Sequence, residues 1–230
     1  MLVKVFSERL GVTVAKVSSY IFHPAFFIVY NLFLTLCFRP HWFGVNSWHD
    51  KTMLLLLVTI YTIIIPFIAI LMLRVLNAIK SIQMYDRHDR IFPLIIILVF
   101  YLWLWINLKH DPSVPKYWIW YLLSAVLSCV ITLIANNWIK SSLHTTAIIA
   151  TLSFWLWIRF LQSPGDSLVL KFDREGIVTY KLDYFLMWMF FVAGWIITGR
   201  LLIQAHRYNE IIIGVIIAII AIIASHRIVF

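Results

Sequence analysis

Long apolar runs separated by short polar segments dominate the chain. Runs of about 17–25 apolar residues are long enough to cross a bilayer as helices. The pattern predicts seven of them, at residues 18–38, 52–75, 91–107, 117–136, 143–162, 184–204 and 210–227. The count falls to six if the proline-containing loop at 108–115 re-enters the membrane. We therefore expect an all-α, polytopic membrane helix bundle that forms a single domain over residues 1–230.

Two segments differ from this pattern. Residues 1–18 mix charged and apolar side chains, which predicts an amphipathic helix at the membrane interface rather than a cleavable signal peptide. Residues 167–182 place β-favouring side chains on both sides of an Asp-Arg-Glu-Gly turn. That arrangement predicts a small β-hairpin at the surface.

Composition supports a membrane protein and excludes a nucleic-acid-binding one. Hydrophobic residues make up 63% of the chain and charged residues only 13%, which is too apolar for a water-soluble domain. The formal net charge is +9, but the Lys and Arg residues are spread through short loops instead of gathering on one face. Anionic lipid headgroups are therefore the expected partners of this charge, and no nucleic acid is expected.

Phosphate-binding residues gather in three loops that share one side of the membrane. Loops after the second, fourth and sixth apolar runs must lie on the same side, because successive runs cross in opposite directions. The three loops contain Lys80, Arg87, His88 and Arg90; Lys140, Ser141, Ser142 and His144; and Arg200, His206 and Glu210, respectively. Three clusters on one side are able to converge into one site.

The third cluster contains the groups needed for covalent phosphoryl transfer. Arg200 supplies a fixed positive charge, and His206 follows it by six residues. Glu210 lies four residues after His206, so the two side chains share a face if this segment is helical. The carboxylate is then able to accept a hydrogen bond from the ring nitrogen that does not attack, which fixes the tautomer. The spacing predicts a phosphohistidine intermediate.

The order and spacing of the three clusters resemble the type-2 phosphatidic acid phosphatases, which share a helical core with vanadium-dependent haloperoxidases. The family motifs are Lys-x6-Arg-Pro, Pro-Ser-Gly-His and Ser-Arg-x5-His-x3-Asp. Residues 80–87 match the first motif without its proline, and residues 141–144 keep the serine and histidine of the second. Residues 199–210 match the third in spacing, with Gly199 for serine and Glu210 for aspartate. The phosphatase-like core would cover about residues 77–228.

The resemblance implies a role for each matching residue. The phosphate would be bound by Lys80, Arg87, Arg200 and Ser142, with Arg90 and Lys140 as further candidates. His206 would be the nucleophile, and His144 would protonate the leaving alkoxide and then activate water. No metal or cofactor is implied. Leu143 stands where the family has glycine, the residue that allows the closest backbone approach to phosphate.

This resemblance implies a metal-independent phosphatase acting on a phosphomonoester or diphosphate of a membrane lipid. It also implies a bacterial inner membrane with the site facing the periplasm or outside. Lys and Arg divide almost evenly between the two sides of the predicted bundle. Setting aside Lys80, Arg87 and Arg200 leaves a slight excess on the opposite side, which favours the same orientation. The sequence names neither the lipid nor the oligomeric state.

Each of these signals also has a structural interpretation. Glu210 is able to act as an ordinary helix cap, and His144 as an interfacial histidine. Lys80, Arg87 and Arg90 fit the positive residues that flank membrane helices and bind headgroups. A second hypothesis is therefore a catalytically inactive, phosphatase-like protein that binds or transports anionic lipid headgroups. A metal-dependent enzyme is disfavoured, because repeated His-x3-His or His-x2-His spacings are absent from the sequence.

Overall fold

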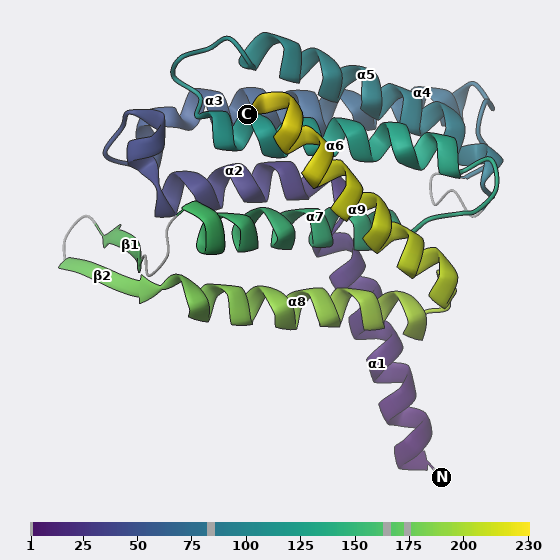
Figure 1. The fold of residues 1–230 in the computed structure, drawn as a ribbon. Coiled ribbons are helices and arrows are strands. Elements are labelled where there is room, and N and C mark those ends of the chain that lie inside the picture. The colour runs from purple at the N-terminus through teal and green to yellow at the C-terminus, as the bar shows by residue number, and fades with distance from the viewer. Residues whose placement is uncertain (1, 82–85, 163–166, 173–175) are drawn as a thin grey trace.

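A computed structural model describes residues 2–81, 86–162, 167–172 and 176–230, and it is a bundle of helices (Figure 1). Seven of the described segments are long and apolar enough to cross a membrane. This confirms the predicted polytopic helix bundle. The helices are α1 (Leu2–Ile21), α2 (Phe27–Phe38), α3 (Thr52–Thr59), α4 (Ile65–Val75), α5 (Ile91–Leu108), α6 (Lys116–Ala135), α7 (Leu143–Trp157), α8 (Leu182–Leu202) and α9 (Tyr208–Val229).

Short turns of other helical types join or extend these elements. A π-helical turn at Ile60–Ile64 continues α3 into α4, and a second at Ile158–Gln162 extends α7. Single 3₁₀ turns lie at Pro24–Phe26, Pro40–Phe43, Trp48–Lys51 and His88–Arg90. The last of these carries the chain directly into α5 and so fixes the position of Arg90.

Helices α6 and α7 form the centre of the bundle. Most helices run side by side, and α9 crosses obliquely over α6 and α7 (Figure 1). The two central helices contribute several large, fully buried side chains, namely Trp118, Trp120, Phe154 and Trp155. Their burial gives α9 a rigid surface to pack on.

The first predicted run, residues 18–38, is not one continuous helix. Helix α1 ends at Ile21, and a 3₁₀ turn beginning at Pro24 separates it from α2. Pro24 lacks an N–H, and it favours an extended backbone at the preceding residue, where His23 has φ −65° and ψ 139°. Helix α2 then has only 12 residues, which is about 18 Å of helix against a hydrocarbon core of about 30 Å. The hydropathy pattern did not reveal this break, because a single proline barely changes the mean hydropathy of the run.

Helix α1 crosses α8 through small residues (Figure 1). A Cβ added to Gly199 would lie 3.6 Å from the Cβ of Ala15, and one added to Gly11 would lie 3.5 Å from the side chain of Leu202. The helix predicted at residues 1–18 is therefore present and extends to Ile21. Its position at a bilayer interface stays a prediction.

The hairpin predicted at residues 167–182 is present. Strands β1 (Ser167–Phe172) and β2 (Gly176–Lys181) pair antiparallel, with Ser167 opposite Lys181 and Phe172 opposite Gly176. The remaining residues of the predicted turn, 173–175, lie outside the described part of the chain. Leu182 begins α8 instead of ending the strand. The hairpin lies at the end of the bundle opposite the α8–α9 connection (Figure 1).

The amino ends of α7 and α9 make close backbone contact. The N–H of Ser142 donates to the carbonyl of Glu210 at 3.1 Å, and the hydroxyl of Thr146 donates to the carbonyl of Gly214 at 3.1 Å. A Cβ added to Gly214 would lie only 2.9 Å from the carbonyl oxygen of Ser142. Glycine at 214 therefore allows the second and third motifs to meet.

We expect Gly214→Ala to destabilise the protein by about 1–3 kcal/mol, because the added methyl group meets a backbone atom that has no room to move. Gly194→Ala on α8 is the matched control, since a Cβ there has nothing within 4 Å, and it should be neutral or slightly stabilising. The free energy of unfolding in mixed micelles measures both changes. Equal effects of the two substitutions would show that the α7–α9 approach is not tight.

Candidate active site

His206 and Glu210 form a buried pair at the start of α9. Nδ1 of His206 lies 2.6 Å from Oε2 of Glu210, and the side chains are 2% and 19% exposed. The same oxygen accepts the N–H of Arg207 at 3.3 Å, which caps α9. The capping and orienting roles considered for Glu210 are therefore compatible, because one carboxylate makes both contacts.

The surroundings of His206 keep its imidazole neutral. Burial, followed by the positive charges of Arg90, Arg200 and Lys140, lowers the pKa of His206 to about 3. At neutral pH the ring then carries one proton. A carboxylate at Nδ1 assigns that proton to Nδ1, which leaves the lone pair on Nε2. A neutral imidazole with this tautomer is the form that a nucleophilic histidine requires.

Three cations surround this pair. Arg90 is 7% exposed, and its guanidinium donates to the carbonyl of Ser141 at 2.9 Å. Arg200, near the end of α8, donates to the hydroxyl of Ser19 at 3.2 Å. Burial and then repulsion by Arg90 lower the pKa of Lys140, while Glu210 attracts its charge. Asp86 also attracts the charge of Lys140, but two carboxylates do not balance three cations, so the cluster favours an anion.

Two polar atoms in this cluster also lack partners among the described residues. The buried Nε of Arg200 has no hydrogen-bond acceptor, and the buried hydroxyl of Ser141 has no partner. An unsatisfied buried donor costs free energy unless a ligand satisfies it. Phosphate oxygens are acceptors of the kind that both groups need.

The structure does not bring the first-motif residues Lys80 and Arg87 to His206. Arg87 is exposed, donates to the carbonyl of Asn137 at 3.0 Å and accepts from the side chain of Asn136 at 2.8 Å. Lys80 is exposed as well. Arg90, considered only as a further candidate from the sequence, is buried among the site residues instead. The 3₁₀ turn at His88–Arg90 explains the difference, since it turns Arg90 inward at the start of α5.

Ser142 and His144 of the second motif lie at the start of α7. The hydroxyl of Ser142 caps this helix by accepting from the hydroxyl of Thr145 at 3.0 Å and from its N–H at 3.4 Å. Its own N–H is already bonded to Glu210. Ser142 therefore joins α7 to α9 and is fully buried. Leu143, the residue in place of glycine, is the first residue of α7 and is partly exposed.

His144 contacts the end of α1 and the turn that follows it, which lie outside the three motifs. Its Nε2–H donates to the carbonyl of Ser19 at 3.2 Å, and its ring lies edge-on to that of His23 with 5.8 Å between centroids. These two residues lie at the junction of α1 and α2. The His23-Pro24 interruption of an apolar run was a sequence signal for this junction, whereas nothing local marked Ser19.

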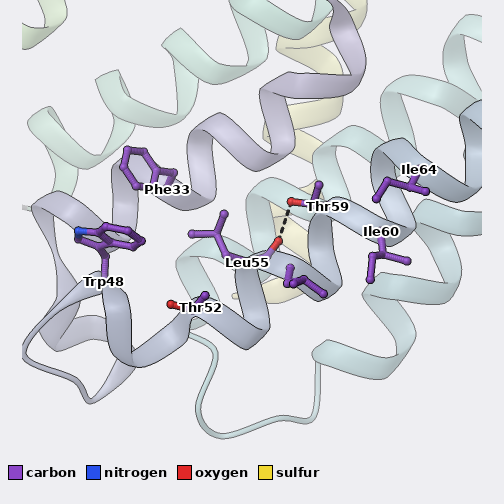
Figure 2. A pocket seen from close by; sticks show the side chains of 8 residues that line it. Phe33, Trp48, Thr52, Leu55, Thr59, Ile60 and Ile64 are labelled. Atoms are coloured by element: carbon purple, nitrogen blue, oxygen red, sulfur yellow. Dashed lines mark hydrogen bonds between the residues drawn. The ribbon is translucent and has the colours of Figure 1, made fainter.

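An apolar groove between α2 and α3 is separate from these polar residues. It has a volume of about 420 Å³ and is lined by Phe33, Trp48, Thr52, Leu55, Leu56, Thr59, Ile60 and Ile64 (Figure 2). The hydroxyl of Thr59 donates to the carbonyl of Leu55 at 2.7 Å, and that of Thr52 to the carbonyl of His49 at 2.7 Å. With both hydroxyls engaged as donors and the other lining side chains apolar apart from the indole of Trp48, the groove contains no charged group for a headgroup.

The candidate site is therefore built from Arg90, Lys140, His144, Arg200, His206 and Glu210. Among the residues that the structure describes, no group of three or more His, Cys, Asp or Glu side chains is arranged to hold a metal ion. Comparison with known proteins found no matching family model, no similar curated protein and no similar solved structure.

We expect the His206 ring to remain neutral and Nδ1-protonated at pH 5. Nitrogen-15 chemical shifts of labelled histidine rings measure this, with the His206 signals assigned by their loss in His206→Gln. Glu210→Ala removes the acceptor and should give a mixture of tautomers. Because the pKa is lowered in the folded state from 6.5 to about 3, the unfolded state binds this proton first. The contribution of His206 to stability is therefore lost as the pH falls through this window. An imidazolium spectrum at pH 5 would contradict the expectation.

Proposed function

We propose that the protein is a membrane-embedded phosphatase that hydrolyses a phosphomonoester or diphosphate of a membrane lipid through a phosphohistidine. The observation that carries the proposal is the 2.6 Å contact between His206 and Glu210 within a cluster of three cations. The site lies where three loops meet at one end of a bundle of apolar helices (Figure 1). A lipid is able to reach such a site with its phosphate at the headgroup level and its chain in the bilayer.

In the first step, the lone pair on Nε2 of His206 forms a bond to phosphorus. The bond between phosphorus and the lipid oxygen breaks, and Nδ1 of His144 takes the proton of the monoprotonated phosphate and passes it to the leaving alkoxide. Arg90, Arg200 and Lys140 stabilise the negative charge spread over the phosphoryl oxygens. Glu210 stabilises the positive charge that develops on His206, because it accepts the Nδ1–H.

In the second step, His144 accepts a proton from water, whose oxygen forms a bond to phosphorus. The phosphorus–nitrogen bond breaks, His144 returns its proton to the departing inorganic phosphate, and both His206 and His144 are neutral again. Because Nε2–H of His144 donates to Ser19, Nδ1 is the atom that carries the exchanged proton. The scheme uses no metal or cofactor.

A second candidate function is binding or transport of anionic lipid headgroups without hydrolysis. The observation that favours it is the engagement of Ser142, whose N–H already bonds Glu210 and whose hydroxyl already caps α7. Phosphate then has fewer donors at the second motif than the family pattern provides. Both candidates place the protein in a membrane, and we propose a bacterial inner membrane with the site facing the periplasm or outside.

We expect His206→Gln to reduce phosphate release from a short-chain phosphatidic acid by roughly 10³-fold or more, because it removes the nucleophile. The measurement is phosphate release by purified protein in detergent. His110→Gln, an exposed histidine of the α5–α6 loop at the other end of the bundle, is the matched control and should retain activity. Unchanged release by folded His206→Gln would remove this residue from the nucleophilic role. A wild-type protein that binds the lipid without releasing phosphate would favour the second candidate.

The structure and the motif spacing make different predictions for the arginines of the α4–α5 connection. We expect Arg90→Gln to raise the dissociation constant of orthovanadate by about 10-fold or more, because a charge-assisted contact is lost. Arg87→Gln should change it by no more than about twofold, since Arg87 bonds a loop carbonyl instead. Isothermal titration in detergent measures both constants. The reverse order of effects would support the family spacing over the observed placement of Arg90.

A further inference from the structure

The last turn of α1 provides a side of the site that none of the three motif loops supplies. The hydroxyl of Ser19 accepts from Arg200 at 3.2 Å, and the carbonyl of the same residue accepts from Nε2–H of His144 at 3.2 Å. The Ser19 hydroxyl in turn donates to the carbonyl of Ala15 at 2.8 Å. One residue of α1 therefore contacts both a cation and an imidazole of the candidate site.

We propose that Ser19 is a positioning residue that holds Arg200 and His144 in their working geometry. Its carbonyl fixes His144 in the Nε2–H tautomer and leaves Nδ1 for proton exchange. Its hydroxyl accepts a hydrogen bond from Nη1 of Arg200 and so orients the guanidinium. The buried Nε of Arg200 has no hydrogen-bond partner among the described residues. The roles of the two held residues rest on the proposed function, whereas the two contacts do not.

Helix geometry explains why this position suits the task. The carbonyls of the last helical turn have no partner further along the helix, so they are able to accept from other segments. Ser19 lies in the last turn of α1, which ends at Ile21. The same end of a helix carries partial negative charge, which favours a guanidinium nearby. The α1 terminus thus offsets part of the positive charge of the cluster.

The packing of α1 against α8 determines the position of Ser19. Ala15 is one helical turn before Ser19 and is 4% exposed, and its Cβ would lie 3.6 Å from a Cβ at Gly199. A larger side chain at 15 has no space there and must move α1 away from α8. Such a movement displaces the backbone carbonyl of Ser19. Substitutions at position 19 change only the side chain and leave this carbonyl in place.

Two substitutions separate the two contacts. Ser19→Ala removes only the hydroxyl, so we expect the dissociation constant of orthovanadate to rise about 3- to 10-fold, with the His144 tautomer unchanged. Ser19→Thr keeps a hydroxyl and should restore the wild-type constant. Ala15→Leu should weaken vanadate binding and also give His144 a mixture of tautomers. Val17→Leu, on an exposed position of α1, is the matched control and should change neither property.

The measurements are vanadate titration and nitrogen-15 shifts of the His144 ring, assigned by their loss in His144→Gln. Wild-type vanadate affinity in Ser19→Ala would overturn the assignment for Arg200. An unchanged His144 tautomer in folded Ala15→Leu would overturn the assignment for His144. Neither readout requires turnover. If the wild type releases no phosphate but both shifts occur, the proposed function fails and the positioning role of Ser19 stands.

Discussion

The backbone contact between α7 and α9 determines the geometry of the whole site. The carbonyl of Glu210 accepts the N–H of Ser142, and Gly214 lets the two helices approach one turn later. Because the side chain of Glu210 also caps α9 and holds His206, one residue links the helix contact, the helix start and the imidazole. A shift of α9 against α7 would therefore change the position of His206 relative to the loop that carries Lys140. The chemistry of the site depends on this close approach of the two helices.

The charge arrangement at this end of the bundle opposes stability in the absence of a ligand. Arg90 is nearly buried, and Arg200 has a buried donor with no protein acceptor in the described residues. Placing such groups away from water costs several kcal/mol per ion unless they are paired. An anion that binds between them offsets that cost, so ligand binding and folding are coupled by mass action. The buried Nε of Arg200, which has no acceptor among the described residues, is thus a group that would give the site affinity for phosphate.

The parts of the structure that the sequence predicted are those set by local patterns. Six of the seven apolar runs predicted helical segments to within a few residues, whereas Pro24 divides the run at 18–38. The β-favouring residues on both sides of the turn at 173–176 predicted the hairpin. The i, i+4 spacing predicted the pair His206 and Glu210 on one helix, but His206 lies two residues before α9 begins at Tyr208, so the contact spans the start of the helix. The sequence did not show that Arg90 rather than Arg87 lies among the site residues. Residue spacing does not indicate which side of a 3₁₀ turn faces the interior of the bundle. The contact of Ser19 with the site could not be predicted from local patterns, because it joins Ser19 to His144, 125 positions along the chain.

The geometry of Glu210 also bears on the choice between capping and catalysis. A cap explains the 3.3 Å contact with the N–H of Arg207, but it requires no contact with His206. The 2.6 Å contact with Nδ1 and the near-complete burial of the ring need a further reason. Anion binding explains the three cations in both candidate functions, yet a binding protein gains nothing from a neutral imidazole with its lone pair on Nε2. A covalent phosphatase would use that lone pair as its nucleophile, and this is why the geometry of Glu210 supports the hydrolysis that we propose.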